Sequence, residues 1–142
     1  GPGKYRASQS IVRRVRLLEN EAILQLRSDK RRNRAYGLNG GKSGDPSWNI
    51  VNPGRDDEYV VSPMGVTTMK QGDVIHHVLA SGGGWGDPLD RDPLLVLEDV
   101  MEERLTVGYV RKEYGVVINE ESMAVDEVAT STLRADRRAV SN

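Results

Sequence analysis

The chain has 142 residues, about one domain's worth of sequence, and its 20 basic and 21 acidic residues give a net charge of -1. This near-balance gives no overall attraction to nucleic acid, membrane surfaces or acidic substrates, and the lack of cysteine excludes disulfides, thiolate nucleophiles and Cys-ligated zinc. No apolar run could span a bilayer and no leader-like segment is found, so we expect a soluble, cytoplasmic protein.

The charge is unevenly distributed along the chain. Residues 1–35 contain ten Lys or Arg and three acidic residues, whereas residues 87–127 contain twelve acidic residues and four basic ones. Opposite charges in two parts of one chain favour either packing of one part against the other or docking of a larger partner.

Strand patterns dominate the first part of the chain. Residues 11–17 and 21–27 alternate apolar and polar side chains, and Glu19-Asn20 between them is a turn signal. We therefore expect these two segments to form a β-hairpin with one solvated face.

The following residues predict loops and shorter strands. Residues 35–53 are rich in Gly, Asn, Ser and Asp, which is typical of a long loop, and this loop touches one short strand at 48–51. Further strands are expected at 59–61, 65–69 and 74–80, with a tight turn at 71–73 before the last. Five or six strands are enough for a small antiparallel or mixed sheet.

Helical patterns begin after the glycine-rich stretch 82–86. Asp90 or Asp92 can cap a helix whose first turn suits Pro93. This helix is expected to end near residue 104, with an apolar face of Leu94, Leu95, Leu97, Val100, Met101 and Leu105.

Three further elements are predicted in the rest of the chain. Thr106 can cap a helix at 107–114 that Gly115 ends, and residues 116–118 are expected to be extended. Residues 126–139 have high helix propensity but weak apolar patterning, which predicts a tail helix that is frayed or stabilised by a partner. The fold class is thus α+β, with a β-rich part at 1–86 containing Gly-rich loops and a helical part at 87–142.

Several motifs suggest a chemical role that their context does not support. Gly37–Ser43 resembles a phosphate-binding P-loop, but its spacing is one residue short and no apolar strand leads into it, so it predicts a loop or a glycine-rich anion nest. The basic run 27–34 has only Tyr36 nearby to stack on a base, so we expect a solvated or subunit-facing strand end and no nucleic-acid binding. The only histidines, His76 and His77, are adjacent in a strand, point to opposite faces and do not form a metal site.

Five motifs in order carry a family resemblance. They are GPGKYR at 1–6, SDKRR at 28–32, YGLNGGKSG at 36–44, KQGDV at 70–74 and GGGWGDPLDRDP at 82–93, continued by EYGVV at 113–117. Together they resemble the hydantoinase B/oxoprolinase family, and the resemblance places this chain at the C-terminal end of a longer B-type subunit. Two positions depart from the usual pattern: Ala7-Ser8 replace two glycines, and Trp85 replaces a tyrosine, which removes a hydroxyl.

The resemblance implies a cytoplasmic, multi-subunit enzyme. An A-type partner would bind ATP and phosphorylate a cyclic amide, and the B-type subunit would help to open it; related ketone carboxylases, of the acetone and acetophenone type, share this layout. ATP and a divalent metal are expected in the whole complex, with neither bound fully by this chain. The partners implied are the A-type subunit and the remaining N-terminal part of the B-type subunit, and a non-catalytic assembly module is the competing hypothesis.

No catalytic residue can be assigned from the sequence. The candidate substrate-binding or anion-binding positions are in two glycine-rich loops, where backbone N–H groups can approach a ligand closely and a lysine can neutralise an anion. These positions are Gly40, Gly41, Lys42, Gly83, Gly84, Trp85 and Asp87.

Overall fold

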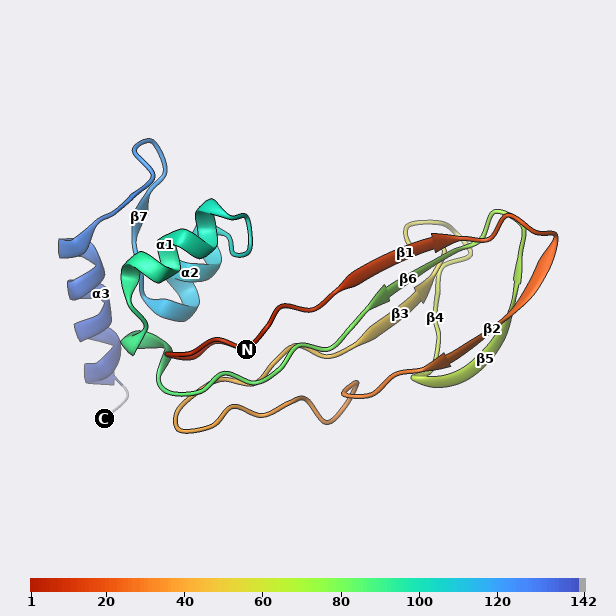
Figure 1. The fold of residues 1–142 in the computed structure, drawn as a ribbon, viewed down its shortest axis with the longest axis horizontal. Coiled ribbons are helices and arrows are strands. Elements are labelled where there is room, and N and C mark those ends of the chain that lie inside the picture. Colours follow the sequence, from red (N-terminus) through yellow and green to blue (C-terminus); the bar gives the residue numbers. More distant parts are fainter. Residues whose placement is uncertain (141–142) are drawn as a thin grey trace. The chain divides into compact units, whose positions relative to one another are not determined.

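The computed structural model describes residues 1–140, and the strands of its two larger sheets precede its three α-helices, as expected for an α+β chain (Figure 1). These residues form two compact units. The sheet unit contains Ser8–Ala35 and Gly44–Gly82, and the helical unit contains Gly1–Ala7, Tyr36–Ser43 and the residues from 83 onward. The boundary expected at residue 86 divides the sequence into a strand-rich part and a helical part. The spatial division differs from it, because Gly1–Ala7 and Tyr36–Ser43 belong to the same unit as the helices.

The sheet unit contains two antiparallel sheets. A four-stranded sheet has the order β1-β6-β3-β4, and a two-stranded sheet pairs β2 with β5. The strands are β1 (Val12–Arg16), β2 (Glu21–Arg27), β3 (Trp48–Val51), β4 (Tyr59–Val60), β5 (Met64–Lys70) and β6 (Val74–Val78).

The expected hairpin of residues 11–27 is wrong, because β1 pairs with β6 and β2 pairs with β5. The segment between β1 and β2 is a bend that passes from one sheet to the other, and it runs antiparallel to the turn before β6: Leu17 N donates to Asp73 O, and Gln71 N donates to Asn20 O. Strand alternation fixes which face is buried, but it does not choose the pairing partner.

The core of the sheet unit is small. Val51, Val61, Met69 and Ile75 are buried, and the inward-facing leucines of β2 pack against them. Ile23, which alternates with those leucines, is 75% exposed. The alternation in β2 therefore predicted its buried face correctly.

The first helix of the helical unit is a short 3-10 helix, η1 (Pro88–Asp90), and it is followed by α1 (Pro93–Met101) and α2 (Val107–Tyr114). Asp92 caps α1, Thr106 caps α2 and Gly115 ends α2 in the left-handed conformation, as the sequence predicts. The strands β7 (Ile118–Asn119) and β8 (Ala124–Val125) form a small ribbon before α3 (Glu127–Val140). None of the helices in residues 1–140 is both long and apolar enough to cross a membrane.

The apolar face expected on α1 is only partly right. Val96 is the side chain that α1 buries completely, in a cluster with Val110, Tyr114, Val116 and Ile118. Leu97, Val100 and Leu105 pack at the edge of this cluster, but the predicted face also included Leu94, Leu95 and Met101, which are exposed. Asp99 lies one turn after Val96 on the buried side, and its ion pairs fix the rotation of the helix.

Helix α3 is attached to the unit by polar contacts, which explains its weak apolar pattern. Asp126 caps it by accepting a hydrogen bond from Ala129 N at 2.9 Å. Thr130 is buried and its hydroxyl accepts from Val117 N at 3.0 Å, while Arg134 donates to Tyr114 O at 3.0 Å. A helix that is held by backbone acceptors does not need an apolar stripe.

Replacing Val110 by alanine is expected to lower the free energy of unfolding by about 2 kcal/mol, because two buried methyl groups are lost and the cavity closes only partly. Val128→Ala is the control, since Val128 is 79% exposed on α3. Urea denaturation followed by circular dichroism measures both variants. Equal destabilisation by the two substitutions would contradict this view of the core.

Candidate functional site

Three extended segments from distant parts of the chain cross in the helical unit. Tyr5 pairs with Trp85 through two hydrogen bonds of 2.9 Å, and Leu38 N donates to Gly84 O on the neighbouring side at 2.9 Å. Lys42 N donates to Pro2 O at 2.8 Å, and Gly84 N donates to Lys42 O at 2.9 Å. The segments 2–5, 37–42 and 83–86 therefore form one hydrogen-bonded crossing.

Three of the candidate glycines are required for this crossing. A Cβ atom at Gly84 would collide with the backbone of Pro2, one at Gly41 with the backbone of Gly84, and one at Gly83 with the backbone of Tyr36. The N–H groups of Gly41 and Gly84 are bonded to Leu38 O and Lys42 O. These two N–H groups are thus already occupied and cannot form an anion nest in this arrangement.

Beside the crossing lies an open pocket of about 540 Å³. It is lined by residues of the glycine-rich segment, of η1, of the end of α2 and of α3. The lining residues are Gly40, Lys42, Asp87, Pro88, Leu89, Glu113, Asp136, Arg137 and Val140. Of the positions predicted from the sequence, this pocket brings together Gly40, Lys42 and Asp87.

The pocket contains charges of both signs. Lys42 Nζ lies 2.8 Å from Glu113 Oε2, and Lys42 is 52% exposed whereas Glu113 is 15% exposed. Arg137 donates to the carbonyls of Lys112 and Arg111, which are among the last acceptors of α2. Lys42 is therefore a cation held at the pocket by one carboxylate, with half of its surface open to solvent.

Asp87 belongs to the pocket wall, whereas Trp85 lies outside the pocket. Asp87 Oδ1 accepts a hydrogen bond from Leu89 N at 2.8 Å and caps η1, so its carboxylate orients the pocket wall. Trp85 is 46% exposed, does not line the pocket, and its ring lies 5.6 Å from that of Tyr5.

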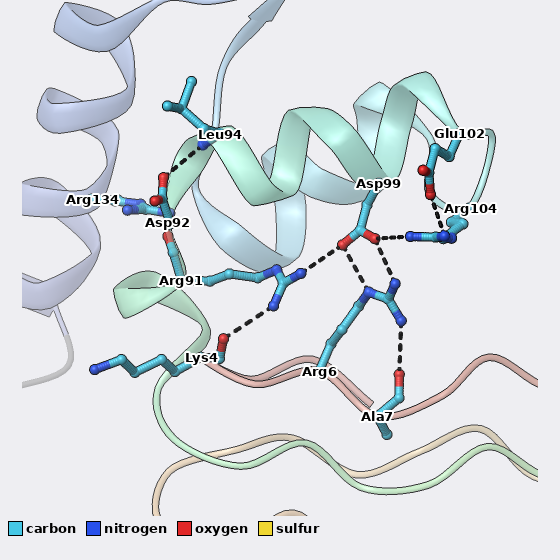
Figure 2. A network of polar contacts seen from close by, with 10 residues as sticks. All are labelled: Lys4, Arg6, Ala7, Arg91, Asp92, Leu94, Asp99, Glu102, Arg104 and Arg134. Atoms are coloured by element: carbon cyan, nitrogen blue, oxygen red, sulfur yellow. Dashed lines mark hydrogen bonds and ion pairs between the residues drawn. The ribbon is translucent and has the colours of Figure 1, made fainter.

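A cluster of arginines around Asp99 supports the crossing (Figure 2). Arg6 makes a two-pronged contact, with Nε 2.8 Å from Oδ2 and Nη2 2.6 Å from Oδ1 of Asp99. Arg91 Nη2 donates to Oδ2 at 3.0 Å, and Arg104 Nη1 approaches Oδ1 at 3.4 Å. Asp99 itself is 2% exposed.

These contacts shift the ionisation of the cluster. Burial alone would raise the pKa of the Asp99 carboxyl, but the hydrogen bond from Arg6 and the charges of Arg6 and Arg91 outweigh burial and leave this pKa below its usual value. The hydrogen bond with Asp99 raises the pKa of Arg6. Burial also raises the pKa of the Tyr114 hydroxyl, to about 12.

Sequence reasoning missed this cluster. Arg6 and Arg91 lie in two of the family motifs, GPGKYR and GGGWGDPLDRDP, but nothing in their spacing identifies the acid that they share. Asp99 is one of twelve acidic residues between 87 and 127. The signal that could have identified Asp99 is its position one turn after Val96 on an amphipathic helix. This position puts the carboxylate on the buried side of the helix, where a charge requires a partner.

The two histidines belong to the sheet unit and face opposite sides of β6, as predicted. His77 pairs in register with Asn49, and its Nδ1 lies 2.5 Å from Asn49 Oδ1. His76 lies opposite Ile50, and its Nδ1 is buried without a hydrogen-bond partner among the described residues. Burial and the charge of Arg13 lower the pKa of His77.

Comparison with known proteins identifies the family. The profile of the hydantoinase B/oxoprolinase family matches residues 1–88, which is more than half of the chain. The chain therefore belongs to the hydantoinase B/oxoprolinase family, and the resemblance drawn from the motifs is confirmed.

Three individual proteins are also similar to this chain. The chain is 30% identical over 137 residues to an uncharacterised protein of Methanocaldococcus jannaschii, covering 94% of this chain and 24% of that protein. It is 29% identical over 135 residues to a putative B-type subunit of a D-/L-hydantoinase of Pseudomonas sp., covering 94% and 22%. It is 29% identical over 100 residues to the acetone carboxylase alpha subunit of Xanthobacter autotrophicus, covering 66% and 13%.

Two solved structures share the fold. The ATP-dependent caprolactamase of Pseudomonas jessenii superposes with a TM-score of 0.76 at 27% identity, over 94% of this chain and 24% of that chain. A nucleotide-free acetone carboxylase superposes with a TM-score of 0.60 at 22% identity, over 73% and 18%, which is a likeness of fold alone. The chain thus spans about a quarter or less of the length of each of these relatives.

Asp99→Asn is expected to lower the free energy of unfolding by about 3 kcal/mol, because it removes the one carboxylate that compensates the half-buried Arg6 and Arg91. The matched control is Glu102→Gln, since Glu102 is exposed and pairs with the exposed Arg104. Thermal unfolding followed by circular dichroism compares the two variants. A loss no larger for Asp99→Asn than for Glu102→Gln would show that the cluster contributes little.

The same carboxylate predicts a dependence on pH. The pKa of Asp99 is lower in the folded chain than in the unfolded chain, so its contribution to stability is complete above the ordinary aspartate pKa of about 4. This contribution is lost as the pH falls through the lowered pKa. Denaturant titrations between pH 3 and 7 should show a smaller acid-dependent loss of stability in Asp99→Asn than in the wild type, and an unchanged loss would contradict the assignment.

Proposed function

We propose that this chain is the C-terminal part of the B-type subunit of an ATP-dependent hydantoinase/5-oxoprolinase-like enzyme, which opens a cyclic amide after it has been activated by phosphorylation. The observation that carries the proposal is the likeness of 94% of the chain to an ATP-dependent caprolactamase, with a TM-score of 0.76. The relative named as a hydantoinase of the same subunit type supports the same class of reaction.

The chemistry explains why such an enzyme would use ATP. A lactam or hydantoin carbonyl is a poor electrophile, because the ring nitrogen donates electron density into it. Transfer of the γ-phosphoryl group from ATP to the carbonyl oxygen releases ADP and makes the carbon electrophilic. One water adds to this carbon, and the ring C–N bond breaks as the nitrogen takes up a proton, which leaves an acyl phosphate. A second water then displaces the phosphate, with the former carbonyl oxygen as part of the leaving group, and gives the carboxylate. In this proposal the A-type subunit transfers the phosphoryl group and the B-type subunit helps to open the activated ring.

The part of this chain that fits such a reaction is the pocket beside Lys42. Its open, mixed-charge lining suits a polar ligand, and Lys42 is a cation with half of its surface accessible. An anionic group of the ligand would take the place of Glu113 as the partner of Lys42. The ammonium group of Lys42 would then stay paired with an opposite charge when the ligand binds. Gly40 adds room next to Asp87, since it has no side chain and a left-handed backbone.

The cofactors and partners are part of the same proposal. Among residues 1–140 no group of three or more His, Asp or Glu side chains is arranged to hold a metal ion, so we assign the divalent metal of the complex to other parts of it. ATP is likewise assigned to the A-type subunit. The chain would act in a hetero-oligomer with that subunit and with the N-terminal part of the B-type subunit.

One alternative has specific support. The likeness to an acetone carboxylase alpha subunit over 66% of this chain favours a ketone carboxylase as the second candidate. In that reaction ATP would activate a ketone and bicarbonate, and a new C–C bond would form. A non-catalytic assembly module is the remaining alternative.

Purification of the chain with its associated subunits separates these functions. We expect large A-type and B-type polypeptides in the complex under native mass measurement, and phosphate release from ATP that depends on a cyclic amide and equals the amount of ring-opened product. Phosphate release that depends on acetone and bicarbonate would favour the carboxylase. A stable, monodisperse chain with no companion protein would favour the independent module.

Lys42→Ala in the whole assembly is expected to lower the rate of ring opening by at least about tenfold, because an anion in the pocket would lose its cation. Thermal stability should change little, since a half-exposed ion pair contributes at most about 1 kcal/mol. Lys112→Ala is the matched control, because Lys112 also approaches Glu113, at 3.7 Å, without lining the pocket. A larger effect on melting temperature than on rate would reassign the loop to a structural role.

A further inference from the structure

Strand β1 is the edge of the four-stranded sheet and is exposed on both of its faces. All five of its residues are exposed, and Val12 and Val15, which point to opposite faces, are each 57% exposed. Strands of a folded sheet normally bury at least one face. The exposure of both faces marks β1 as a surface that this chain alone does not cover.

The backbone of β1 has a free row of hydrogen-bonding groups. Leu79 N donates to Ile11 O, and Leu17 N donates to Asp73 O, so the odd-numbered residues of this segment face β6. In an antiparallel pair the residues between them point the other way. The N–H and C=O groups of Val12, Arg14 and Arg16 therefore face the open edge, where none of the described strands pairs with them.

The side chains of β1 add uncompensated positive charge. Arg13, Arg14 and Arg16 make no hydrogen bond or ion pair with any other residue in the described part of the chain. By contrast, Arg6, Arg91 and Arg134 of the helical unit are each bonded to a carboxylate or a carbonyl. Three guanidinium groups within one five-residue strand, on both of its faces, attract a partner of opposite charge.

We propose that the open edge of β1 binds an extended acidic segment of another polypeptide, which adds to the sheet as a fifth strand. The added strand would donate to and accept from Val12, Arg14 and Arg16, and acidic side chains would lie opposite the three arginines. Apolar side chains would lie opposite Val12 and Val15. Read antiparallel to β1, the partner sequence has the order acidic, apolar, acidic, acidic, apolar.

The chemistry of β1 selects a protein strand over other anionic partners. It contains two exposed valines among its three arginines, and Ile11 beside it is 54% exposed, so a partner must cover apolar surface as well as neutralise charge. A phosphate backbone would satisfy only the arginines. A purely protective role, in which charges keep an edge from aggregating, predicts that no strand binds.

A synthetic peptide tests the edge directly. The probe is acetyl-Thr-Glu-Val-Glu-Glu-Val-Thr-amide, and the control peptide has lysine in place of each glutamate. With the ¹⁵N-labelled full chain, we expect saturable NMR shifts at the amides of Val12, Arg14 and Arg16 with the acidic peptide, weakened by added salt, and none with the basic peptide. No saturable shift at millimolar peptide, shifts confined to other regions, or equal binding of both peptides would overturn the proposal.

Protein variants provide a second measurement. The double variant Arg14→Glu/Arg16→Glu should lose the shifts caused by the acidic peptide and should bind the basic peptide instead. Arg111→Glu is the matched control, because Arg111 is an exposed arginine of α2 whose side chain makes no hydrogen bond with any of residues 1–140. This variant should bind the acidic peptide as the wild type does. Equal loss of binding in the control would overturn the assignment to β1.

Hydrogen exchange in the purified assembly tests the natural partner. The amides of Val12, Arg14 and Arg16 should exchange more slowly in the assembly than in the chain alone, because a fifth strand would accept their hydrogen bonds. Exchange at the same rate in both samples would overturn the proposal even if the peptide binds.

Discussion

The helical unit depends on one buried carboxylate. Asp99 neutralises arginines from the N-terminal segment, from the end of η1 and from the segment after α1, and it is the only acidic group that Arg6 and Arg91 contact among residues 1–140. A charge in this position is costly without partners and favourable with them, so it fixes both the rotation of α1 and the position of the segment that carries Arg6. The segment with Arg6 continues into the glycine-rich crossing, and the crossing forms one side of the pocket at Lys42. The candidate site is thus held in place by an interaction that is not part of it.

Glycine has two different roles in the motifs that define the family resemblance. At Gly41, Gly83 and Gly84 it permits backbone segments to touch, and the N–H groups of Gly41 and Gly84 are consumed by that packing. At Gly40 it faces the pocket. A glycine-rich motif therefore identified the correct region of the chain, but it did not by itself distinguish a ligand-binding loop from a packing requirement.

The parts of the fold that could be predicted from the sequence are those set by local chemistry. The caps at Asp92 and Thr106, the end of α2 at Gly115 and the alternation of β2 all follow from neighbouring residues. The hairpin failed because pairing partners are chosen over long distances, and four other strands lie between β1 and β6 in the sequence. The apolar face of α1 failed because a charged residue, Asp99, occupies the buried side. Lys42 was singled out from its motif, but its partner Glu113 could not be, since only the folded chain brings them together.

The crossing also has a consequence for synthesis on the ribosome. Tyr5 and Lys4 bond to Trp85 and Gly86, so the first residues of this stretch cannot reach their final positions until the second glycine-rich segment has left the exit tunnel. Until then an unpaired, arginine-bearing segment is exposed. A chaperone or a companion protein that binds the nascent chain would have its best opportunity in this interval, and slowing translation before residue 86 would prolong it.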